Sequence, residues 1–243
     1  MIAFRGISFA YRSGEPLLRG VDLDIPAGVT LLVGPNGSGK STVLKIAAGV
    51  ERPDGGTVRI GERDLWGDEE AARGELAYVP EQPDLTPYAT IADVIALVCR
   101  LRAVPLGRGR EALDAAGLAG LASRSIRELS MGQRRRAVLA AAWIGAPRVV
   151  LLDEPLEGMD RAMRERIVTW VDRLRGAGAA VVVATHEIEP FVEDAARVIS
   201  VRAGVCRTWE PLPGVVAARW KLVERLARGE DANLVLDRPT PKA

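Results

Sequence analysis

The sequence predicts an α/β fold with three parts: an N-terminal antiparallel β subdomain, a parallel sheet core and an inserted helical lobe. Three observations predict it. A glycine-rich loop joins an apolar strand to a helix within residues 29–48. Apolar strands alternate with helices after residue 148, an order typical of a parallel, doubly wound sheet. Residues 85–145 between these two regions are mostly helical in pattern and form the lobe.

Composition restricts the function before any motif is considered. The chain has 243 residues, enough for one core with a smaller lobe. Its 33 basic and 32 acidic side chains nearly cancel, so no global charge draws it to nucleic acid or to an anionic membrane. The single histidine leaves no His-based metal cluster, and the two cysteines, far apart, predict reduced thiols in a cytosolic protein. The longest apolar run, residues 137–146, is too short to span a bilayer, which needs about 20 residues.

The first 60 residues predict the antiparallel subdomain. Residues 1–11 alternate apolar and polar side chains, and we expect them to form an antiparallel edge strand. Residues 21–25 alternate as well and are followed by the turn Pro26-Ala27-Gly28. A further short strand is predicted at residues 57–61, after a turn rich in glycine.

The glycine-rich loop fits the phosphate-binding pattern G-x-x-x-x-G-K-[ST] at every specified position. Its residues are Gly34, Pro35, Asn36, Gly37, Ser38, Gly39, Lys40, Ser41 and Thr42, between a strand at 29–33 and a helix at 41–48. Glycines let successive backbone N–H groups converge on an anion, which the helix N-terminus also favours. Lys40 would reach the β- and γ-phosphates and the Ser41 hydroxyl would bind Mg²⁺. The alternative is an ordinary glycine-rich turn, but the surrounding pattern predicts a P-loop NTPase sheet core.

The middle of the chain predicts the lobe. A strand at residues 76–80 ends at Glu81 and Gln82. From Thr90 the apolar spacing is helical, and Thr90 with Asp93 forms a possible capping box. The helical lobe is therefore placed at about residues 85–145.

The last third predicts the rest of the core. The buried strand at 149–153 is followed by a helix at 160–174 and by strands at 179–184 and 197–201. The division that follows is a domain at residues 1–213 built around the phosphate loop, with a helix at 216–226 and a fraying tail from residue 231 completing 214–243.

Two adjacent carboxylates close the strand at residues 149–153. Asp153, at the carboxyl end of the strand and beside the phosphate loop, can hold Mg²⁺ through its water shell. Glu154 points to the other side and can act as the general base that polarises the attacking water, a role that adds about 10²- to 10⁴-fold in rate. The alternative is that the two acids merely end a strand.

The stretch Leu129-Ser130-Met131-Gly132-Gln133 is similar to LSGGQ, the signature sequence of the ATP-binding subunit of ABC transporters. Ser130 and Gln133 also fit the S-x-x-Q capping box, so the stretch taken alone could be ordinary helix-start chemistry. Its position before a strand that ends in two acids favours the functional interpretation. The resemblance covers roughly residues 1–210.

The resemblance to ABC transporters implies roles for further residues. Ser130, Gly132 and Gln133 would contact the γ-phosphate bound at Lys40 of a second subunit. Gln82 resembles the Q-loop glutamine, which senses metal and γ-phosphate, and His186 resembles the switch histidine. Asp160 matches the D-loop, and Tyr11 lies where the family stacks an aromatic ring on adenine, unless it is simply a packed strand residue. The chain departs from the pattern at Met131, Leu156 and Met159, which puts turnover rate and dimer fit in doubt more than ATP binding.

These features together predict an ATPase with ATP and Mg²⁺ as cofactors. The resemblance implies a head-to-tail dimer with a second copy, or with a related ATPase subunit, at the cytoplasmic, inner face of the cell membrane. This dimer would power a separate integral membrane transporter subunit. Residues 85–105 resemble exporter-type subunits, so export of an unidentified substrate is expected. The alternative is a soluble ABC-type ATPase of translation, repair or cluster assembly. A P-loop kinase or GTPase is disfavoured, because neither class needs the Leu129-to-Gln133 stretch.

Overall fold

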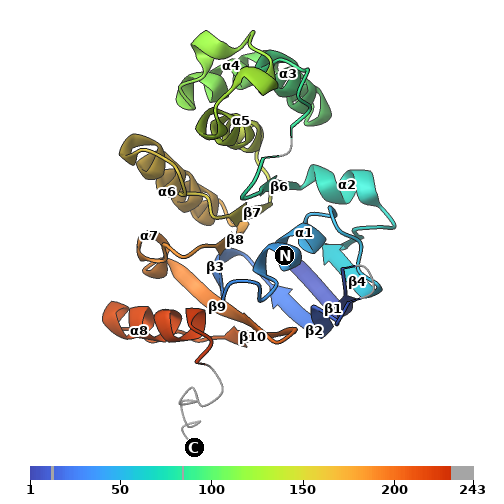
Figure 1. Ribbon diagram of the computed structural model, residues 1–243, viewed down its shortest axis with the longest axis vertical. Coiled ribbons are helices and arrows are strands. Elements are labelled where there is room, and N and C mark those ends of the chain that lie inside the picture. Colours follow the sequence, from blue (N-terminus) through green and yellow to red (C-terminus); the bar gives the residue numbers. More distant parts are fainter. Residues whose placement is uncertain (12–13, 84, 231–243) are drawn as a thin grey trace, which may run out of the picture.

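The computed structural model describes residues 1–11, 14–83 and 85–230. Two sheets form the body of the protein, and a group of helices stands at one end of it (Figure 1). The larger sheet has the strand order β10-β9-β3-β8-β7-β6, and the smaller has the order β2-β1-β4-β5. The expected tail at 231–243 lies outside the described residues.

The smaller sheet is the antiparallel subdomain. Its strands are β1 (Ile2–Phe9), β2 (Leu18–Ile25), β4 (Gly55–Ile60) and β5 (Arg63–Asp64). The prediction that residues 1–11 form an edge strand is wrong, because β1 pairs with both β2 and β4. Alternating side chains reveal that one face of a strand is buried, but they do not reveal how many neighbours the strand has.

The larger sheet is the parallel core. It contains β3 (Gly28–Val33), β6 (Leu76–Val79), β7 (Val149–Asp153), β8 (Ala180–Ala184), β9 (Ala195–Arg202) and β10 (Val205–Trp209). The first five run parallel to one another, whereas β10 folds back antiparallel on β9. This antiparallel edge strand was not predicted from the sequence. It is joined to the smaller sheet where the Arg19 N–H donates to the Gly204 carbonyl at 2.9 Å.

The central strands β3, β7 and β8 are buried on both faces, so their alternate side chains enter two different cores. In β7, Val150 and Leu152 enter one core, and Val149 and Leu151 enter the other. The first core packs under α6 (Arg161–Gly176), α7 (Glu189–Val192) and α8 (Val216–Ala227). The second packs between α1 (Lys40–Ala47) and the smaller sheet. Because β7 is buried on both faces, all of its central residues are apolar, and this is the continuous apolar run from which the strand was predicted.

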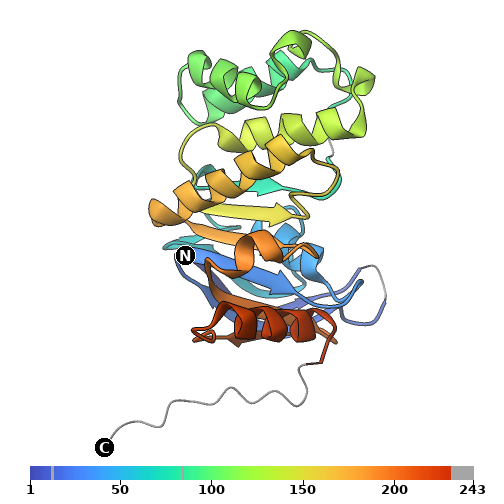
Figure 2. The same ribbon diagram turned by 90° about the vertical axis from the view of Figure 1, so that its left-hand side faces the viewer.

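The helical lobe has a third core of its own. It consists of α3 (Ile91–Leu101), α4 (Leu106–Ala115), two short 3₁₀ turns and α5 (Met131–Trp143), while α2 (Glu69–Gly74) lies before β6. Ile95, Cys99 and Ala140 are buried among these helices. Figure 2 shows the lobe above the sheets, with α6 crossing beneath it. The Trp143 ring of α5 meets the Trp170 ring of α6 edge-on, with centroids 6.2 Å apart, so the lobe and core touch through aromatic packing.

Both cysteines are free, as expected for reduced thiols. Cys99 is fully buried in the lobe. Burial raises the pKa of the Cys206 thiol to about 12, which keeps it in the unreactive protonated form. Among the described residues, no helix is both long and apolar enough to cross a bilayer.

Candidate nucleotide site

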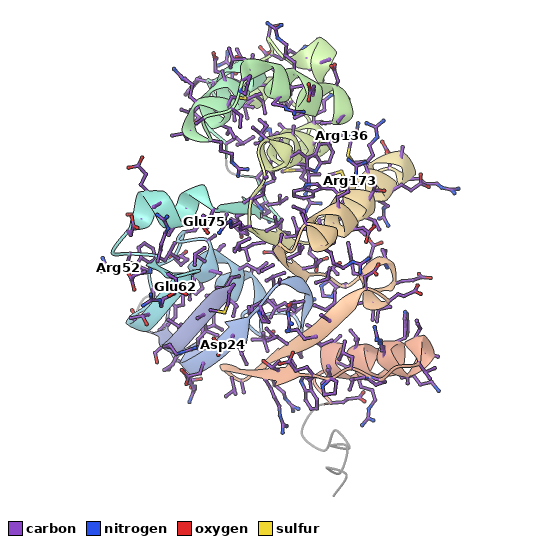
Figure 3. All side chains as sticks on the ribbon, turned by 180° about the vertical axis from the view of Figure 1, so that it is seen from behind. Asp24, Arg52, Glu62, Glu75, Arg136 and Arg173 are labelled. Atoms are coloured by element: carbon purple, nitrogen blue, oxygen red, sulfur yellow. The ribbon has the colours of Figure 1, made fainter. Side chains whose placement is uncertain are left out.

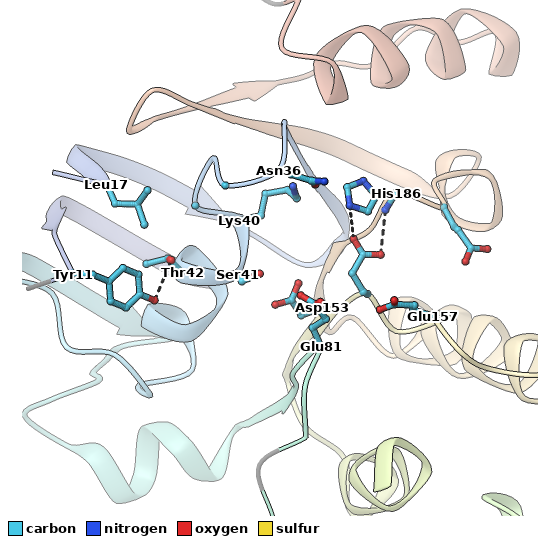
Figure 4. A pocket seen from close by; sticks show the side chains of 14 residues that line it. Tyr11, Leu17, Asn36, Lys40, Ser41, Thr42, Glu81, Asp153, Glu157 and His186 are labelled. Atoms are coloured by element: carbon cyan, nitrogen blue, oxygen red, sulfur yellow. Dashed lines mark hydrogen bonds and ion pairs between the residues drawn. The ribbon is translucent and has the colours of Figure 1, made fainter. Parts of the chain in front are cut away.

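A cleft of about 640 Å³ lies at the carboxyl ends of β3, β7 and β8, where parallel strands of such sheets place their ligands. Figure 4 shows its lining side chains converging from the two sheets. Ten of the predicted site residues line this cleft: Tyr11, Asn36, Gly37, Gly39, Lys40, Ser41, Thr42, Asp153, Glu154 and His186. The sequence placed these residues more than 170 positions apart, and the fold brings them together.

The phosphate loop owes its shape to three glycines with positive φ. Gly34, Gly37 and Gly39 have φ of 151°, 75° and 106°, values that favour glycine. Gly39 is the left-handed N-cap of α1, so the free N–H groups of the first helical turn point toward the cleft. The Lys40 ammonium lies within the loop and donates to the carbonyls of Gly34 at 2.8 Å and Pro35 at 3.2 Å. Burial lowers the pKa of Lys40, and the nearby carboxylates of Glu154, Asp153 and Glu81 oppose that shift.

The predicted loop residues Gly34, Pro35 and Ser38 do not line the cleft. The Ser38 hydroxyl is buried and has no hydrogen-bond partner among the described residues. At the other end of the cleft, Tyr11 stands edge-on to Phe9 with ring centroids 4.8 Å apart, and its hydroxyl lies 3.3 Å from the Thr42 hydroxyl. Tyr11 is 47% exposed at this end of the cleft.

Asp153 is buried beneath the loop, with only 3% of its surface exposed. The Ser41 side chain lies close enough to lower the pKa of this carboxyl group. Burial raises the pKa of Asp153 to about 6, and Glu81 and Glu154 add to this rise, while Ser41 and Lys40 oppose it. Two hard oxygen donors, one hydroxyl and one carboxylate, fit Mg²⁺, which commonly takes only one or two protein carboxylates and completes its shell with phosphate and water.

The raised pKa of Asp153 gives a testable pH dependence. Because the folded chain binds this proton more tightly than the unfolded chain, the free energy of unfolding falls as the pH rises from about 4 to about 6. Asp153→Asn removes that cost, and we expect it to stabilise the nucleotide-free protein by about 1–3 kcal/mol above pH 6, with the gain vanishing toward pH 4. Urea unfolding with chelator present, from pH 4.5 to 7.5, measures this. A variant less stable than wild type at pH 7.5 would contradict it.

Glu154 has an unusual backbone, with φ of 47° in a residue that is not glycine. This conformation costs free energy, and it turns Glu154 across the end of β8. Its carboxylate accepts from the Thr185 hydroxyl at 3.1 Å and from the His186 N–H at 3.2 Å, and it lies 3.3 Å from His186 Nε2. Glu154 thus has its partners after β8, in Thr185 and His186. Thr185 was missed, although a hydroxyl residue between a strand end and a histidine is a readable signal.

Gln82 does not reach the cleft, and this corrects the sequence prediction. The Gln82 side chain is exposed and does not line the site, whereas its neighbour Glu81 does. Both residues lie in a bend after β6, which ends at Val79, and this bend turns Glu81 toward the cleft. The sequence pattern did not decide which of the two would face it. Glu81, and not Gln82, is therefore the residue of this pair that lines the cleft with Asp153.

The Ser130-to-Gln133 stretch also lies away from this cleft within one chain. Ser130 and Gln133 form a reciprocal capping box at the start of α5, with bonds of 2.9 Å and 3.2 Å, and the intervening Gly132 has open space around it. Asp160 caps α6 by accepting from the Met163 N–H at 2.9 Å, and it pairs with Arg136 at 2.5 Å. Ser130 and Gln133 therefore do cap a helix, as the alternative interpretation of the stretch predicted. A role for this stretch in binding phosphate would require a second subunit.

Comparison with known proteins supplies the family. The family model described as "ABC transporter" matches residues 18–157. The chain belongs to the ABC transporter family. A putative ABC transporter ATP-binding protein of Streptomyces coelicolor is 36% identical over 198 residues, which cover 78% of this chain and 70% of that protein. An aliphatic sulfonates import ATP-binding protein of Pseudomonas fluorescens is 36% identical over 208 residues, which cover 82% and 75%.

The fold of this ABC protein also matches solved ATP-binding cassettes. A cassette solved as a dimer in a post-hydrolysis state with ADP and Pi superposes with a TM-score of 0.76 at 28% identity, covering 88% of this chain and all of that one. The expected fold class is confirmed, as is the recognition of an ABC ATP-binding subunit. The ABC subunit described here is accordingly an ATPase.

Proposed function

We propose that this ABC subunit works by closing a head-to-tail homodimer around ATP and opening it after hydrolysis, and that this motion drives a separate membrane-spanning transporter subunit. The observation that carries the proposal is the separation of the cleft from the Ser130-to-Gln133 stretch. One chain holds the phosphate loop, the carboxylates and His186 together in the cleft, whereas no residue of the Ser130-to-Gln133 stretch lines it. A second copy would supply Ser130, Gly132 and Gln133, and Asp160 would lie at the same contact.

The roles proposed for the cleft residues follow their geometry. Glu154 takes the proton of the attacking water, because it lies in the cleft and is aimed by Thr185 and His186. His186 orients this base and reaches the γ-phosphate, Lys40 binds the β- and γ-phosphates, and Tyr11 stacks on adenine. The phosphate loop, residues 34–42, binds the remaining phosphate oxygens through its N–H groups.

Charge in the cleft supports a metal ion as part of the substrate complex. The described residues that line the cleft include one lysine, Lys40, and no arginine. They include five acids, which are Glu81, Asp153, Glu154, Glu157 and Glu187. A nucleoside triphosphate carries further negative charge into this site, so a divalent cation has to offset the repulsion. No three acidic, histidine or cysteine side chains among the described residues form a metal cluster by themselves, which fits a metal held jointly with phosphate. Ser41 and Asp153 would hold Mg²⁺, which neutralises charge that develops on the phosphates.

The membrane partner and the site of action are inferred from the family. We propose that residues 1–213 form the ATP-binding domain, with the lobe at about 85–145, and that the protein acts on the cytoplasmic, inner face of the cell membrane. The relative in Pseudomonas fluorescens is named as an import subunit, so the export expected from residues 85–105 gains no support from it. The soluble alternative in translation, repair or cluster assembly also gains none. Deleting the membrane partner should release the protein from the membrane fraction, and unchanged fractionation would refute the partnership.

A pair of capping variants tests whether Ser130 does more than cap a helix. Ser130→Ala removes the cap of α5, and Thr90→Ala removes the same kind of capping box from α3 in the same lobe. Each should lower the free energy of unfolding by about 1 kcal/mol. Only Ser130→Ala should also weaken ATP-dependent dimerisation, by about tenfold or more, because Ser130, unlike Thr90, would bind the γ-phosphate held by the partner.

Sedimentation with ATP in a background that blocks hydrolysis measures this difference. If both variants dimerise like the parent protein, Ser130 is a structural cap only, and the head-to-tail arrangement loses its main support.

A further inference from the structure

Three consecutive arginines on the first turns of α5 reach three different parts of the protein. Successive helical positions are about 100° apart, so neighbouring side chains diverge. Arg134 donates to the carbonyls of Ile126 and Arg127, both within the lobe, at 3.1 Å each. Arg136 pairs with Asp160 at the start of α6, and Figure 3 shows it where α5 faces that helix. Arg135, between them, points into the junction between the lobe and the core.

Arg135 is largely enclosed by the lobe and the core. Its side chain is only 13% exposed. Its Nε and Nη2 donate to the Glu81 carbonyl at 2.9 Å and 2.6 Å, and Nη2 also donates to Glu157 Oε2 at 2.8 Å. Nη1 donates to the Glu157 carbonyl. One guanidinium thus holds two segments that lie 76 residues apart in the sequence, at Glu81 two residues after β6 and at Glu157 after β7.

Both segments carry acids that face the nucleotide cleft. Glu81 lines the cleft beside Asp153, and fixing its carbonyl fixes the backbone from which its carboxylate projects. Glu157 closes the turn after β7, because its N–H donates to the Glu154 carbonyl at 3.2 Å. Holding Glu157 therefore holds the turn that contains Glu154 in its strained backbone conformation. Arg135 itself does not line the cleft.

We infer that Arg135 is a positioning residue for hydrolysis, which clamps the Glu81 junction and the Glu157 turn so that the Glu81 and Glu154 carboxylates keep their places around the γ-phosphate. The inference rests on the proposed role of Glu154. Because the clamp is anchored on α5, it also makes the placement of both carboxylates depend on the position of the lobe. Four donations from a planar fork to two segments require arginine, since a lysine ammonium cannot span the same acceptors.

The test compares Arg135→Gln with Arg134→Gln. Both variants remove an arginine that bonds backbone carbonyls from neighbouring positions of the same helix, but Arg134 has its contacts inside the lobe. We expect Arg135→Gln to lower kcat about 10- to 100-fold, the range that misplacement of reacting groups by about 1 Å produces. ATP affinity, measured with a fluorescent ATP analogue under non-hydrolysing conditions, should change less than about threefold, because the phosphate loop is untouched. Arg134→Gln should keep kcat within about twofold at a comparable loss of stability.

Two further measurements separate positioning from general damage. Arg135→Lys should recover less than about a third of the lost kcat, since a single ammonium replaces one acceptor pair at most. Urea unfolding of all three variants shows whether the rate follows stability. Equal loss of kcat in Arg134→Gln and Arg135→Gln, or unchanged kcat in Arg135→Gln, would overturn the inference. If Glu154→Gln retains wild-type turnover, the proposed base is wrong, whereas the Arg135 comparison still reports on the clamp.

Discussion

Glu154→Gln is expected to lower ATP turnover by about 10²- to 10⁴-fold, the contribution of a positioned general base. The amide keeps the size of the side chain and can still accept from Thr185 and His186, so the site should stay folded and bind nucleotide. It cannot take a proton from water. Because ATP then persists between two chains, the variant should form a stable dimer with MgATP, while the wild type passes through that state only briefly.

Single-turnover hydrolysis and sedimentation velocity with and without ATP measure both effects. Glu187→Gln serves as the comparison, because Glu187 lines the same cleft but its carboxylate is paired with Arg164. Its effect on turnover should remain under about tenfold. A Glu154→Gln protein that hydrolyses ATP at the wild-type rate would remove Glu154 from the chemistry. One that loses turnover yet stays monomeric with ATP would count against the dimer.

Gly34→Ala is expected to disable the phosphate loop. Gly34 has φ of 151°, and an added Cβ would lie 2.3 Å from the Val201 carbonyl oxygen and 2.9 Å from the Ser38 hydroxyl. Val201 belongs to β9, whose backbone is fixed by the sheet, so the loop must move instead. Strain and overpacking together should cost about 2–6 kcal/mol. Displacing the loop also misdirects the N–H groups that bind phosphate, so nucleotide binding should be lost.

Gly20→Ala is the control for backbone strain alone. Gly20 has φ of 62°, but open space surrounds its added Cβ, and it lies in β2 away from the cleft. We expect this variant to lose about 1–2 kcal/mol and to bind nucleotide normally. Urea unfolding and equilibrium binding of a fluorescent ATP analogue compare the pair. If Gly34→Ala binds ATP like Gly20→Ala, the close approach of the loop to β9 does not support the site.

The sequence determined the parts of this protein whose chemistry is local. The phosphate loop can be recognised from sequence because its glycines, Lys40 and Ser41 lie within one short stretch and all serve to bind phosphate and its metal ion. The strand β7 and its two terminal acids are readable because a strand buried on both faces must be continuously apolar. The capping boxes at Thr90 and Ser130 are readable because both partners lie within four residues, and the structure contains both.

Tertiary structure decided what depends on neighbours distant in the chain. It placed β1 between two strands, because pairing partners leave no mark on one strand's alternation. It directed Glu81 rather than Gln82 into the cleft. A shift of the backbone by one residue would exchange the directions of these two side chains, and the local sequence does not fix that shift. Tertiary structure also joined Glu81 and Glu157 through Arg135, and Glu154 to Thr185 and His186. Local residue types specify which groups are present, but only long-range packing specifies which of them meet.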